Sequence, residues 1–428
     1  NIEDLFDVEG LGVVCTPKCG SCRCGKCAAG GKDFTLKEER ELQLIENGLV
    51  RHSNFWEASY PWLREPSTLE NNCCVAGAML KRTEKRLLKD KDLAETYQKQ
   101  IDDMIDRKVA VKLTEEEQAV YEGPIQYISH HEVIKKDSTS TPCRIVFNSS
   151  AKYKGISLND CWAKGPDIMN NMLGILIRFR EGKVAIAGDI KKMYHSVHLS
   201  QLDQHMHRFL WRDLNVDQEM ETYMFTRVCF GDRPAGTIAS VALQRTAHEF
   251  EQEYPRAVDV ILNNAYVDDI IDSFDDAAEA ALTIQRINEI LESGGFFTKE
   301  WISNMAISNV SLLSTTYPAV GKVSIDKTKI LGMHWNPIKD KFEFKVHLNF
   351  SPRQRKVRTG PDLTLKQLAI EEVALTKRMV LSQINGIYDP LGLLVPFTTK
   401  AKVLMQALWV NEAKDLGWDD VLPDEIQN

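Results

Sequence analysis

The sequence predicts an α+β fold, and two stretches carry most of that prediction. The first, Tyr266-Val267-Asp268-Asp269, lies between the apolar segments 258–262 and 270–271, which predicts a tight β-hairpin with the acidic pair at its turn. The second is the apolar run Val184–Ile190, which predicts a buried strand with Asp189 at its exit. Helical patterns precede and follow these strands, so we expect a mixed fold.

A helix and a strand are expected directly after the acidic hairpin. Asp275 or Asp276 would cap a helix from about Ala277 to Ser293, and Gly294 would end it. The residues expected to face inward are Leu282, Ile287, Ile290 and Leu291. A strand at 296–302 would complete an arrangement of strand, helix and strand around the acidic pair.

Helical patterns also occupy other parts of the chain, beginning with a capping box at Thr35–Glu38. The further segments expected to be helical are 75–107, a turn at 114–117, 237–252, 363–384 and 398–412. The last of them would place Val403, Leu404, Leu408 and Trp409 in the core. Extended chain is expected at 121–147, around a polar turn at 135–142, and at 329–335 and 340–346.

The three carboxylates suggest a metal site. Side by side, Asp268 and Asp269 repel each other, and a divalent cation would neutralise them, although a polar surface turn also fits the pair. With Asp189 on an adjacent strand, they could hold two Mg²⁺ ions about 3.5–4 Å apart, with Mn²⁺ as an alternative, as nucleotidyl transfer requires. Tyr194 could lie under the sugar of a nucleotide, where a 2′-OH would collide with the ring.

In these features the chain resembles reverse transcriptases, and more closely the pol polyprotein of Bel/Pao-type LTR retrotransposons. The motifs that carry the resemblance follow one another in order: Arg144–Ser150, Ser157–Asp160, Gly188–Ile190, Phe230–Ala235, Tyr266–Asp269, Gly294–Phe296, Lys299 with Trp301, and Leu331–Met333. The later stretch Tyr388–Leu393 is similar to the segment that follows the polymerase in this family. The resemblance implies a right-hand polymerase of fingers, palm and thumb.

The resemblance also implies which residues perform the chemistry. Asp189, Asp268 and Asp269, with the carbonyl of Ile190, would bind the two metal ions. Lys299, the only lysine of its strand, resembles the residue that can protonate departing pyrophosphate, and an ordinary solvent-facing lysine fits the sequence nearly as well.

Nucleotide contacts are expected from two further segments. A hairpin with Lys135 on one arm and Arg144 on the other could place two cations over a triphosphate, and Lys136 is an equally placed rival of Lys135. Phe230 stands where retroviral enzymes have Gln, so a contact there would be apolar, and Gly231 would let the backbone approach the nucleotide. An exposed charged hairpin and an ordinary junction between a loop and a helix are the alternatives.

The segment 329–335 resembles the primer grip, which would set the primer 3′-OH against the metals. Its residues are Leu331, Gly332, Met333, His334 and Trp335. The last two are expected to contact the primer backbone, and the glycine would allow another backbone to approach closely.

Composition bounds these interpretations. The chain has 428 residues, which is enough for two or three domains. Its net charge is −8, so nucleic-acid binding would need local basic patches, and the candidates are 81–91 and 353–358. No signal peptide or membrane span is visible. The resemblance implies a cytoplasmic location within virus-like particles. The domain boundaries expected are a Cys-rich segment at 1–33, a helical connector at 34–120, fingers and palm at 121–345, and the thumb with the start of a Pao-type connection at 346–428.

Five of the ten cysteines lie within the first 27 residues. Cys19, Cys22, Cys24 and Cys27 form two CxxC pairs that suit thiolate coordination of zinc, but the single residue between the pairs is too short for a zinc ribbon. A flexible thiol-rich linker is the alternative. Because the chain begins at Asn1, we expect it to be a fragment of a longer translation product.

The expected activity is RNA- and DNA-templated DNA synthesis. Its partners would be RNA and DNA templates, a primer strand and dNTPs, while the protease, ribonuclease H and integrase of the polyprotein would lie outside this chain. A catalytically decayed or co-opted nucleic-acid-binding or assembly module is the alternative. Proteolysis is disfavoured because no D-[ST]-G tripeptide occurs, and the nearest match, Asp137-Ser138-Thr139, lacks the glycine.

Overall fold

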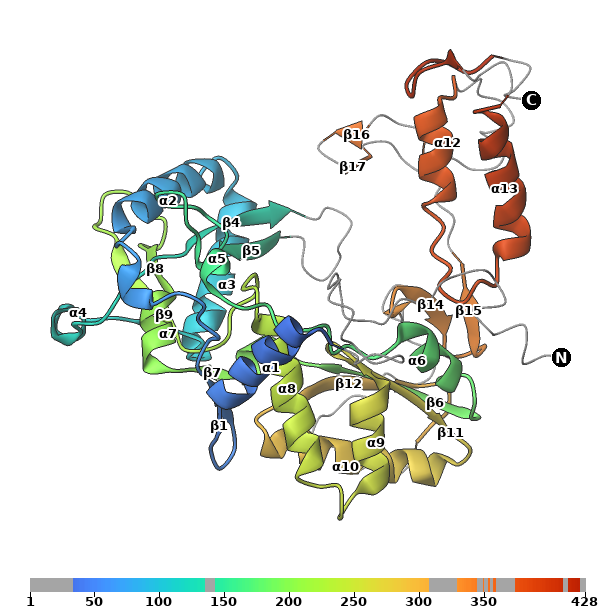
Figure 1. Ribbon diagram of the computed structural model, residues 1–428, viewed down its shortest axis with the longest axis horizontal. Coiled ribbons are helices and arrows are strands. Elements are labelled where there is room, and N and C mark those ends of the chain that lie inside the picture. The colour runs from blue at the N-terminus through green and yellow to red at the C-terminus, as the bar shows by residue number, and fades with distance from the viewer. Residues whose placement is uncertain are drawn as a thin grey trace. The chain divides into compact units, whose positions relative to one another are not determined.

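The computed structural model describes residues 34–134, 143–307, 329–344, 349, 353–354, 357–358, 374–410 and 415–423 (Figure 1). The chain divides into two compact units. Unit 1 consists of Asn1–Met169, Ile190–Leu262 and Gln285–Lys299, and unit 2 of Asn170–Asp189, Asn263–Ile284 and Glu300–Asn428. Helices and strands are mixed in both units, which confirms the α+β class.

Unit 1 begins with the helix α1 (Leu36–Gly48), whose start is the predicted capping box of Thr35 and Glu38. The strands that follow form a small sheet of order β1-β2-β7, with bounds Leu49–Arg51, Trp56–Ala58 and His198–Leu199. A short 3-10 helix, η2 (Pro66–Thr68), leads toward the next helices.

A hairpin and two helices form the next part of unit 1. The strands β4 (Ser129–Ile134) and β5 (Cys143–Asn148) pair antiparallel, which confirms the predicted hairpin. The helix α2 (Cys73–Leu87) packs against β4, and α3 (Lys91–Asp106) packs against β5 (Figure 1). The single helix expected at 75–107 is therefore two helices, because Asp90 accepts a hydrogen bond from the Leu93 amide and begins a new one.

A second sheet in unit 1 has the order β3-β9-β8, with bounds Ala110–Lys112, Glu221–Phe225 and Arg208–Trp211. The short helices around these strands are α4 (Glu115–Val120), α5 (Leu158–Cys161), η3 (Met193–Ser196) and α7 (Gln201–Met206). The helix expected at 237–252 is α8 (Ala235–His248).

The prediction of an extended apolar arm at 258–262 is wrong, because these residues lie in the helix α9 (Pro255–Asn264). Val258 and Ile261 are buried at helical spacing, and Pro255 occupies the first helical position, where its missing N–H costs nothing. The hairpin arm is instead the two-residue strand β10 (Ala265–Tyr266).

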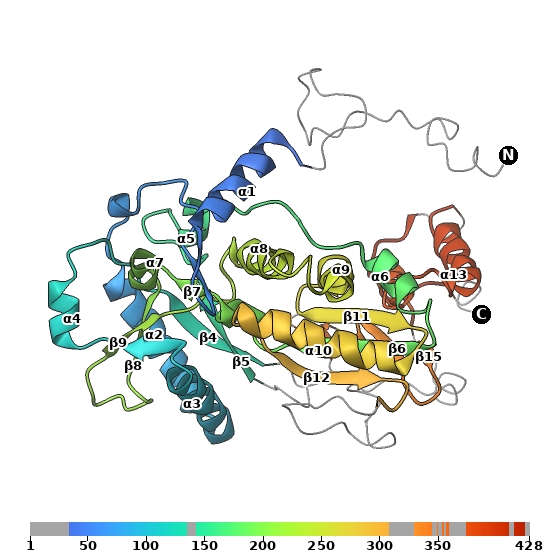
Figure 2. The same ribbon diagram turned by 90° about the horizontal axis from the view of Figure 1, so that it is seen from below.

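The central sheet of unit 2 has the order β10-β11-β6-β12. Its strands β11 (Asp269–Phe274) and β6 (Val184–Ile190) pair antiparallel over six residue pairs (Figure 2), and β6 has the predicted bounds. β12 (Thr298–Ser303) lies beside β6. Gly188 of β6 is needed here, because a Cβ would lie 2.7 Å from the ring of Trp301.

Helices follow and precede these strands. The predicted helix after the hairpin is α10 (Ala277–Ser293), with the Asp276 carboxylate accepting from the Ala278 amide. Ile287, Ile290 and Leu291 are buried as predicted, but Leu282 is 55% exposed, and Ala280 and Ile284 are the additional inward positions. α6 (Met172–Arg178) contributes to the core of unit 2.

The segment predicted as one strand at 329–335 is a hairpin. β13 (Lys329–Ile330) and β14 (Met333–Asn336) pair antiparallel around a turn at Leu331 and Gly332, whose φ values of 48° and 86° are both left-handed. β15 (Lys341–Glu343) completes this sheet. Gly332 is therefore needed for the turn and for the close packing of the Tyr388 ring, because a Cβ would lie 2.9 Å from that ring. The predicted close approach at Gly332 is made by this ring and not by another backbone.

The C-terminal elements of unit 2 are a short strand pair and two helices. Their bounds are β16 (Arg353–Gln354), β17 (Val357–Arg358), α12 (Lys377–Ile384) and α13 (Val395–Ala407). Leu408 is buried as predicted, but Val403, Leu404 and Trp409 are at least 40% exposed. Their placement in the core is wrong, because Met405, Leu408 and Leu422 form the small apolar cluster instead. No helix within the described ranges is long and apolar enough to cross a membrane.

Candidate active site

The acidic hairpin forms as predicted. Tyr266 pairs with Asp269 across a two-residue turn of Val267 and Asp268, so the acidic pair occupies the turn and the first position of β11. Asp269 also pairs with Asp189 at the end of β6. Three carboxylates that are distant in sequence are therefore brought to the same end of the central sheet of unit 2.

The turn holds its backbone in an unusual conformation. Val267 has a φ of 55°, in the left-handed region that a β-branched residue rarely adopts. A two-residue hairpin turn with positive φ at its first residue normally has Gly there. Strain of this kind persists only where the surrounding structure imposes it, and it concentrates at functional sites.

The carboxylates repel one another. The pKa of Asp269 is raised to about 7, first by burial and then by the negative charges of Asp268 and Asp189. Asp269 is half-buried and Asp268 exposed, so the cluster is open to solvent on one side. Because the deprotonated carboxylates repel one another, a bound cation would lower the electrostatic free energy of this site.

The donor set suits magnesium. Carboxylate oxygens are the ligands that Mg²⁺ prefers, and the ion commonly takes only one or two of them, with water and substrate phosphates completing its shell. Among the described residues, no three His, Cys, Asp or Glu side chains are grouped closely enough to hold a metal ion.

Two other residues predicted for catalysis lie on the neighbouring strands. Ile190 ends β6 and its side chain is fully buried, so only its carbonyl could serve a metal. Lys299 lies on β12 and is exposed. Their roles stay predictions.

The residues predicted to contact the nucleotide lie in unit 1, and two of them touch. The rings of Tyr194 and Phe230 have centroids 4.7 Å apart, and His195 contacts the same Phe230 ring edge-on at 5.0 Å. Phe230 is 47% exposed although it is large and apolar. The pair presents an aromatic surface of the kind on which a base or sugar can pack.

Gly231 fits its position for two reasons. Its φ is 104°, and a Cβ would lie 2.8 Å from the carbonyl oxygen of Phe147 in β5. Asn159 fixes the same loop, because its amide donates to the Gly231 carbonyl at 3.0 Å and its side-chain oxygen accepts from the Arg233 amide at 2.7 Å. The close approach predicted for Gly231 is therefore to the protein's own strand β5.

The cation pair predicted for the triphosphate is placed in part. Arg144 lies on β5, exposed, opposite Val133 of β4. Lys135 and its rival Lys136 lie outside the described residues, as do the zinc candidates Cys19, Cys22, Cys24 and Cys27.

The segment predicted as the primer grip has a buried interior in unit 2. Met333 and Trp335 are 2% and 1% exposed, and the indole of Trp335 donates to Asp340 at 3.0 Å. The side chain of Trp335 belongs to the core of unit 2, and its predicted contact with a primer stays a prediction. His334 is also buried, while the hydroxyl of Tyr388 donates to the Leu331 carbonyl at 2.9 Å and covers the turn.

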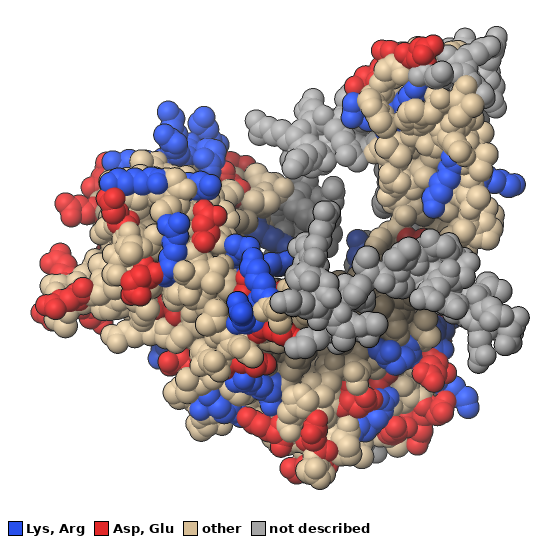
Figure 3. Space-filling model, viewed as in Figure 1, with Lys and Arg blue, Asp and Glu red and all other residues tan. Residues whose placement is uncertain are grey.

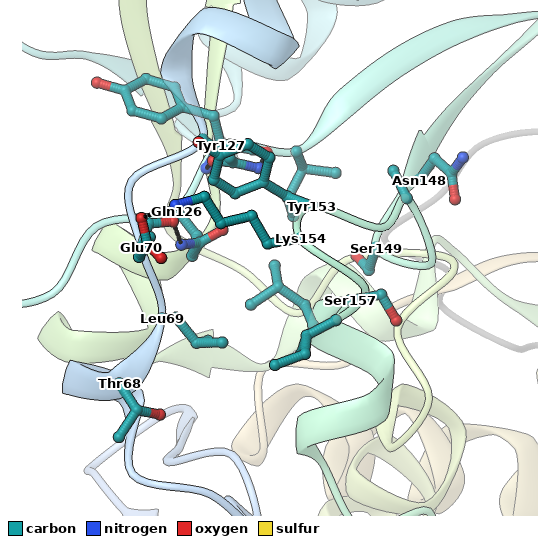
Figure 4. Close-up of a pocket in the computed structure, with 15 residues that line it drawn as sticks. Thr68, Leu69, Glu70, Gln126, Tyr127, Asn148, Ser149, Tyr153, Lys154 and Ser157 are labelled. Atoms are coloured by element: carbon teal, nitrogen blue, oxygen red, sulfur yellow. Dashed lines mark hydrogen bonds and ion pairs between the residues drawn. The ribbon is translucent and has the colours of Figure 1, made fainter.

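A cavity in unit 1 opens near the end of β5 (Figure 4). Asn148 and Ser149 line it on one side, and Tyr153 and Lys154, which forms an ion pair with Glu70, line it on another. None of the residues predicted for catalysis lines this cavity.

Unit 1 also contains a buried polar network that was not expected from the sequence. His207 and Asp232 form an ion pair at 3.0 Å, and both side chains have 0% exposure. Tyr60 donates to the same Asp232 carboxylate at 2.7 Å. Nothing in the residue spacing signals this network, since its members come from separate segments and Asp232 resembles an ordinary residue before a helix.

Comparisons with known proteins indicate which families parts of this chain are similar to. Residues 132–307 match the family model described as reverse transcriptase (RNA-dependent DNA polymerase), and residues 376–428 match the Pao retrotransposon-like RNaseH-like domain. The search of curated proteins finds no match. Among solved structures, a foamy viral protease-reverse transcriptase in complex with double-stranded DNA is similar at 14% identity and a TM-score of 0.35, covering 56% of this chain. The chain spans 33% of the length of that protein.

The middle of the chain, which carries the acidic hairpin, is therefore similar to reverse transcriptase domains. Its C-terminal segment 376–428 is similar to a domain of Pao-type retrotransposons.

Proposed function

We propose that this chain is an RNA-directed DNA polymerase that joins a dNTP to a primer 3′-OH with two divalent ions. The observation that carries the proposal is the pairing of Asp189 with Asp269, which brings Asp268 to the same sheet end and raises the pKa of Asp269 to about 7. Carboxylates that repel one another in this way are suited to share cations.

The roles of the residues follow from their positions. Asp189, Asp268 and Asp269, with the carbonyl of Ile190, would hold Mg²⁺ or Mn²⁺. When bound, the ions would activate the primer hydroxyl and neutralise the departing pyrophosphate. Lys299 would donate a proton to that leaving group.

Other side chains would bind the nucleotide. Arg144, with Lys135 or Lys136, would neutralise the triphosphate. Phe230 and Tyr194 would supply the apolar surface for the base and sugar, with the Tyr194 ring excluding a 2′-OH, and Gly231 would keep their loop close to β5. For the primer grip we retain the backbone of the turn at Leu331 and Gly332, since the side chains of Met333, His334 and Trp335 are buried.

A basic surface in unit 1 supports nucleic-acid partners despite the net charge of −8. Lys and Arg gather over α2 (Figure 3), where Lys81, Arg82, Lys85 and Lys89 are exposed. Within the described part of the chain, none of the four has a carboxylate at ion-pair distance, whereas Arg86 pairs with Glu132 at 2.6 Å. Such a surface suits the phosphate backbone of an RNA or DNA template.

The architecture belongs to the same proposal. The hairpin β4–β5 with α2 and α3 would be the fingers, and the sheet β10-β11-β6-β12 would be the palm. The later elements of unit 2 would form the thumb and the beginning of the Pao-type connection. The segments 1–33 and 34–120 would be the Cys-rich segment and the helical connector. The protein would work beside the other domains of its polyprotein, in virus-like particles in the cytoplasm.

A primer extension assay tests the proposal. The chain is given a homopolymer RNA template, a DNA primer, dNTPs and Mg²⁺, and we expect extension that Asp268→Asn removes while the unfolding curve is unchanged. Asp92→Asn, the same substitution at an exposed site on α3, is the matched control and should extend normally. Extension retained by Asp268→Asn would refute the catalytic assignment, and no extension by the wild type would favour a decayed binding module.

A further inference from the structure

The loop of Phe230 and Gly231 is exposed, yet the next residue is among the most buried acids of unit 1. Asp232 is 6% exposed, whereas Phe230 is 47% exposed. The loop therefore presents an apolar ring to solvent and anchors itself from beneath through one carboxylate. What binds that carboxylate decides where the ring lies.

Three donors converge on Asp232. Its Oδ2 accepts from the Tyr60 hydroxyl at 2.7 Å and from His207 Nε2 at 3.0 Å, and its Oδ1 accepts from the Ser149 hydroxyl. Ser149 directly follows β5, the strand that carries Arg144. The carboxylate thus ties the loop to the end of β5 and to β8, the strand that follows His207.

His207 is held so that both ring nitrogens donate. Nδ1 lies 2.6 Å from the carbonyl oxygen of Asp203, which can only accept, so Nδ1 carries a proton. Nε2 faces a carboxylate that already accepts from two hydroxyls, so it also donates. The ring stacks on Trp162 at 5.2 Å with an angle of 2°, and Tyr60 contacts it edge-on at 5.0 Å, which fixes its plane.

The charges around this ring are few. Burial alone would lower the pKa of His207, but the charge of Asp232, the hydrogen bonds to Asp232 and Asp203, and the charge of Asp203 raise it above its usual value. The Asp203 carboxylate, whose own pKa is raised by burial, accepts from the Tyr60 amide and the Trp62 indole, each at 2.9 Å, and from the Ser200 hydroxyl at 2.6 Å. Cys229 and Tyr60 are the other titratable groups near Asp232, and burial keeps both neutral by raising their pKa values.

We propose that the buried ion pair of His207 and Asp232 is a positioning device for the nucleotide, which holds Phe230, and through it the Tyr194 ring, at the height where a deoxyribose fits. The inference rests on the proposed polymerase function. Phe230 contacts Tyr194 at 4.7 Å, so a loop that rises or tilts moves the ring that would exclude a 2′-OH. His207 and Asp232 act through these rings and do not themselves touch the substrate.

A second buried ion pair provides a matched control. Arg212 donates to both oxygens of Glu84 at 2.8 and 2.6 Å, and the side-chain exposures are 9% and 1%. The pair joins α2 to the segment after β8, and in the part of the chain that the structure describes neither residue forms a hydrogen bond or ion pair with Phe230, Gly231 or Asp232. Glu84→Gln should therefore weaken the fold as Asp232→Asn does without moving the loop.

The experiment compares His207→Gln, Asp232→Asn and Glu84→Gln below their unfolding temperatures, with Tyr60→Phe as a milder variant that removes one hydrogen bond to Asp232. We expect the first two to raise the dNTP KM about tenfold with a smaller change in kcat, and to lower the preference for dNTP over rNTP. Tyr60→Phe should shift both quantities in the same direction by less, and Glu84→Gln should shift neither.

Amide hydrogen exchange of residues 229–236 supplies a readout that does not need activity. We expect faster exchange in His207→Gln and Asp232→Asn than in Glu84→Gln. Unchanged exchange in the loop would overturn the positioning role, and so would faster exchange with dNTP KM and sugar preference equal to those of Glu84→Gln. A wild type that fails to extend a primer would refute the polymerase function itself, and the exchange comparison would still decide whether the pair holds the loop.

Discussion

Two groups of acidic side chains in this protein have opposite surroundings. In unit 1, Asp232 and Asp203 are buried among hydrogen-bond donors. A protonated His207 donates to the Asp232 carboxylate and to the backbone carbonyl of Asp203. In unit 2, Asp269 has burial and two neighbouring carboxylates as the causes of its raised pKa. An acid that is buried among donors and paired with a cationic ring secures structure, whereas an acid whose pKa is raised by burial and by neighbouring acids is suited to bind a cation.

The largest expected effect separates the two groups by stability. Asp232→Ala should cost about 3–5 kcal/mol, because it leaves His207 charged or unpaired in a site without solvent. Asp269→Asn should cost nothing at neutral pH and could raise stability, because it removes a repulsion. Urea unfolding of both variants measures the contrast, and a marked loss of stability in Asp269→Asn would contradict the view that repulsion by Asp268 and Asp189 dominates the surroundings of Asp269.

The pH dependence of stability should differ in the same way. The pKa of Asp269 is raised in the folded state from an ordinary value of 3.8 to about 7, so folding favours the protonated form. The resulting stabilisation is fully present below pH 3.8 and is lost as pH rises through about 7. Relative to Asp269→Asn, the wild type should therefore become less stable between these values and level off above them.

Magnesium should reverse that trend, because the ion binds the deprotonated carboxylate. Apparent Mg²⁺ affinity, followed as the shift of the unfolding midpoint, should rise with pH until about 7 and then stay constant. The Asp269→Asn variant should lack the rise. If the Mg²⁺-induced shift of the unfolding midpoint of the wild type did not change with pH, the ion would bind at a site other than Asp269.

The unit 2 site was predictable because its signals are local. The apolar run of β6 fixes a strand with Asp189 at its exit, and Asp276 and Gly294 bound α10 with standard caps. The fold class and the hairpin follow from these patterns, and the convergence of the three acids was expected from the family resemblance. The prediction for 258–262 was wrong because an apolar run of that length is compatible with a strand or a helix. The burial of Val258 and Ile261, three residues apart, favours the helix.

The unit 1 network was not predictable, because burial and not residue type makes it. His207 and Asp232 are 25 residues apart, and neither follows a pattern that marks it as buried. The same reason explains the errors along α13, where Val403, Leu404 and Trp409 were assigned to the core without knowledge of the neighbouring elements. Tertiary contacts decide which acids meet a cation and which apolar side chains stay exposed.

The smallest expected effect tests how tightly the Phe230 and Gly231 loop lies on β5. Gly155 and Gly231 both have left-handed φ values, 85° and 104°, but a Cβ on Gly155 meets nothing within 4 Å, whereas one on Gly231 lies 2.8 Å from the Phe147 carbonyl. Gly155→Ala should cost about 1 kcal/mol from backbone strain alone. Gly231→Ala should cost more, because a backbone oxygen cannot move aside as a flexible side chain can, and it should also raise the dNTP KM. Equal losses of stability in the two variants, with the KM unchanged, would mean that the loop yields easily and that its contact with β5 does not set the position of Phe230.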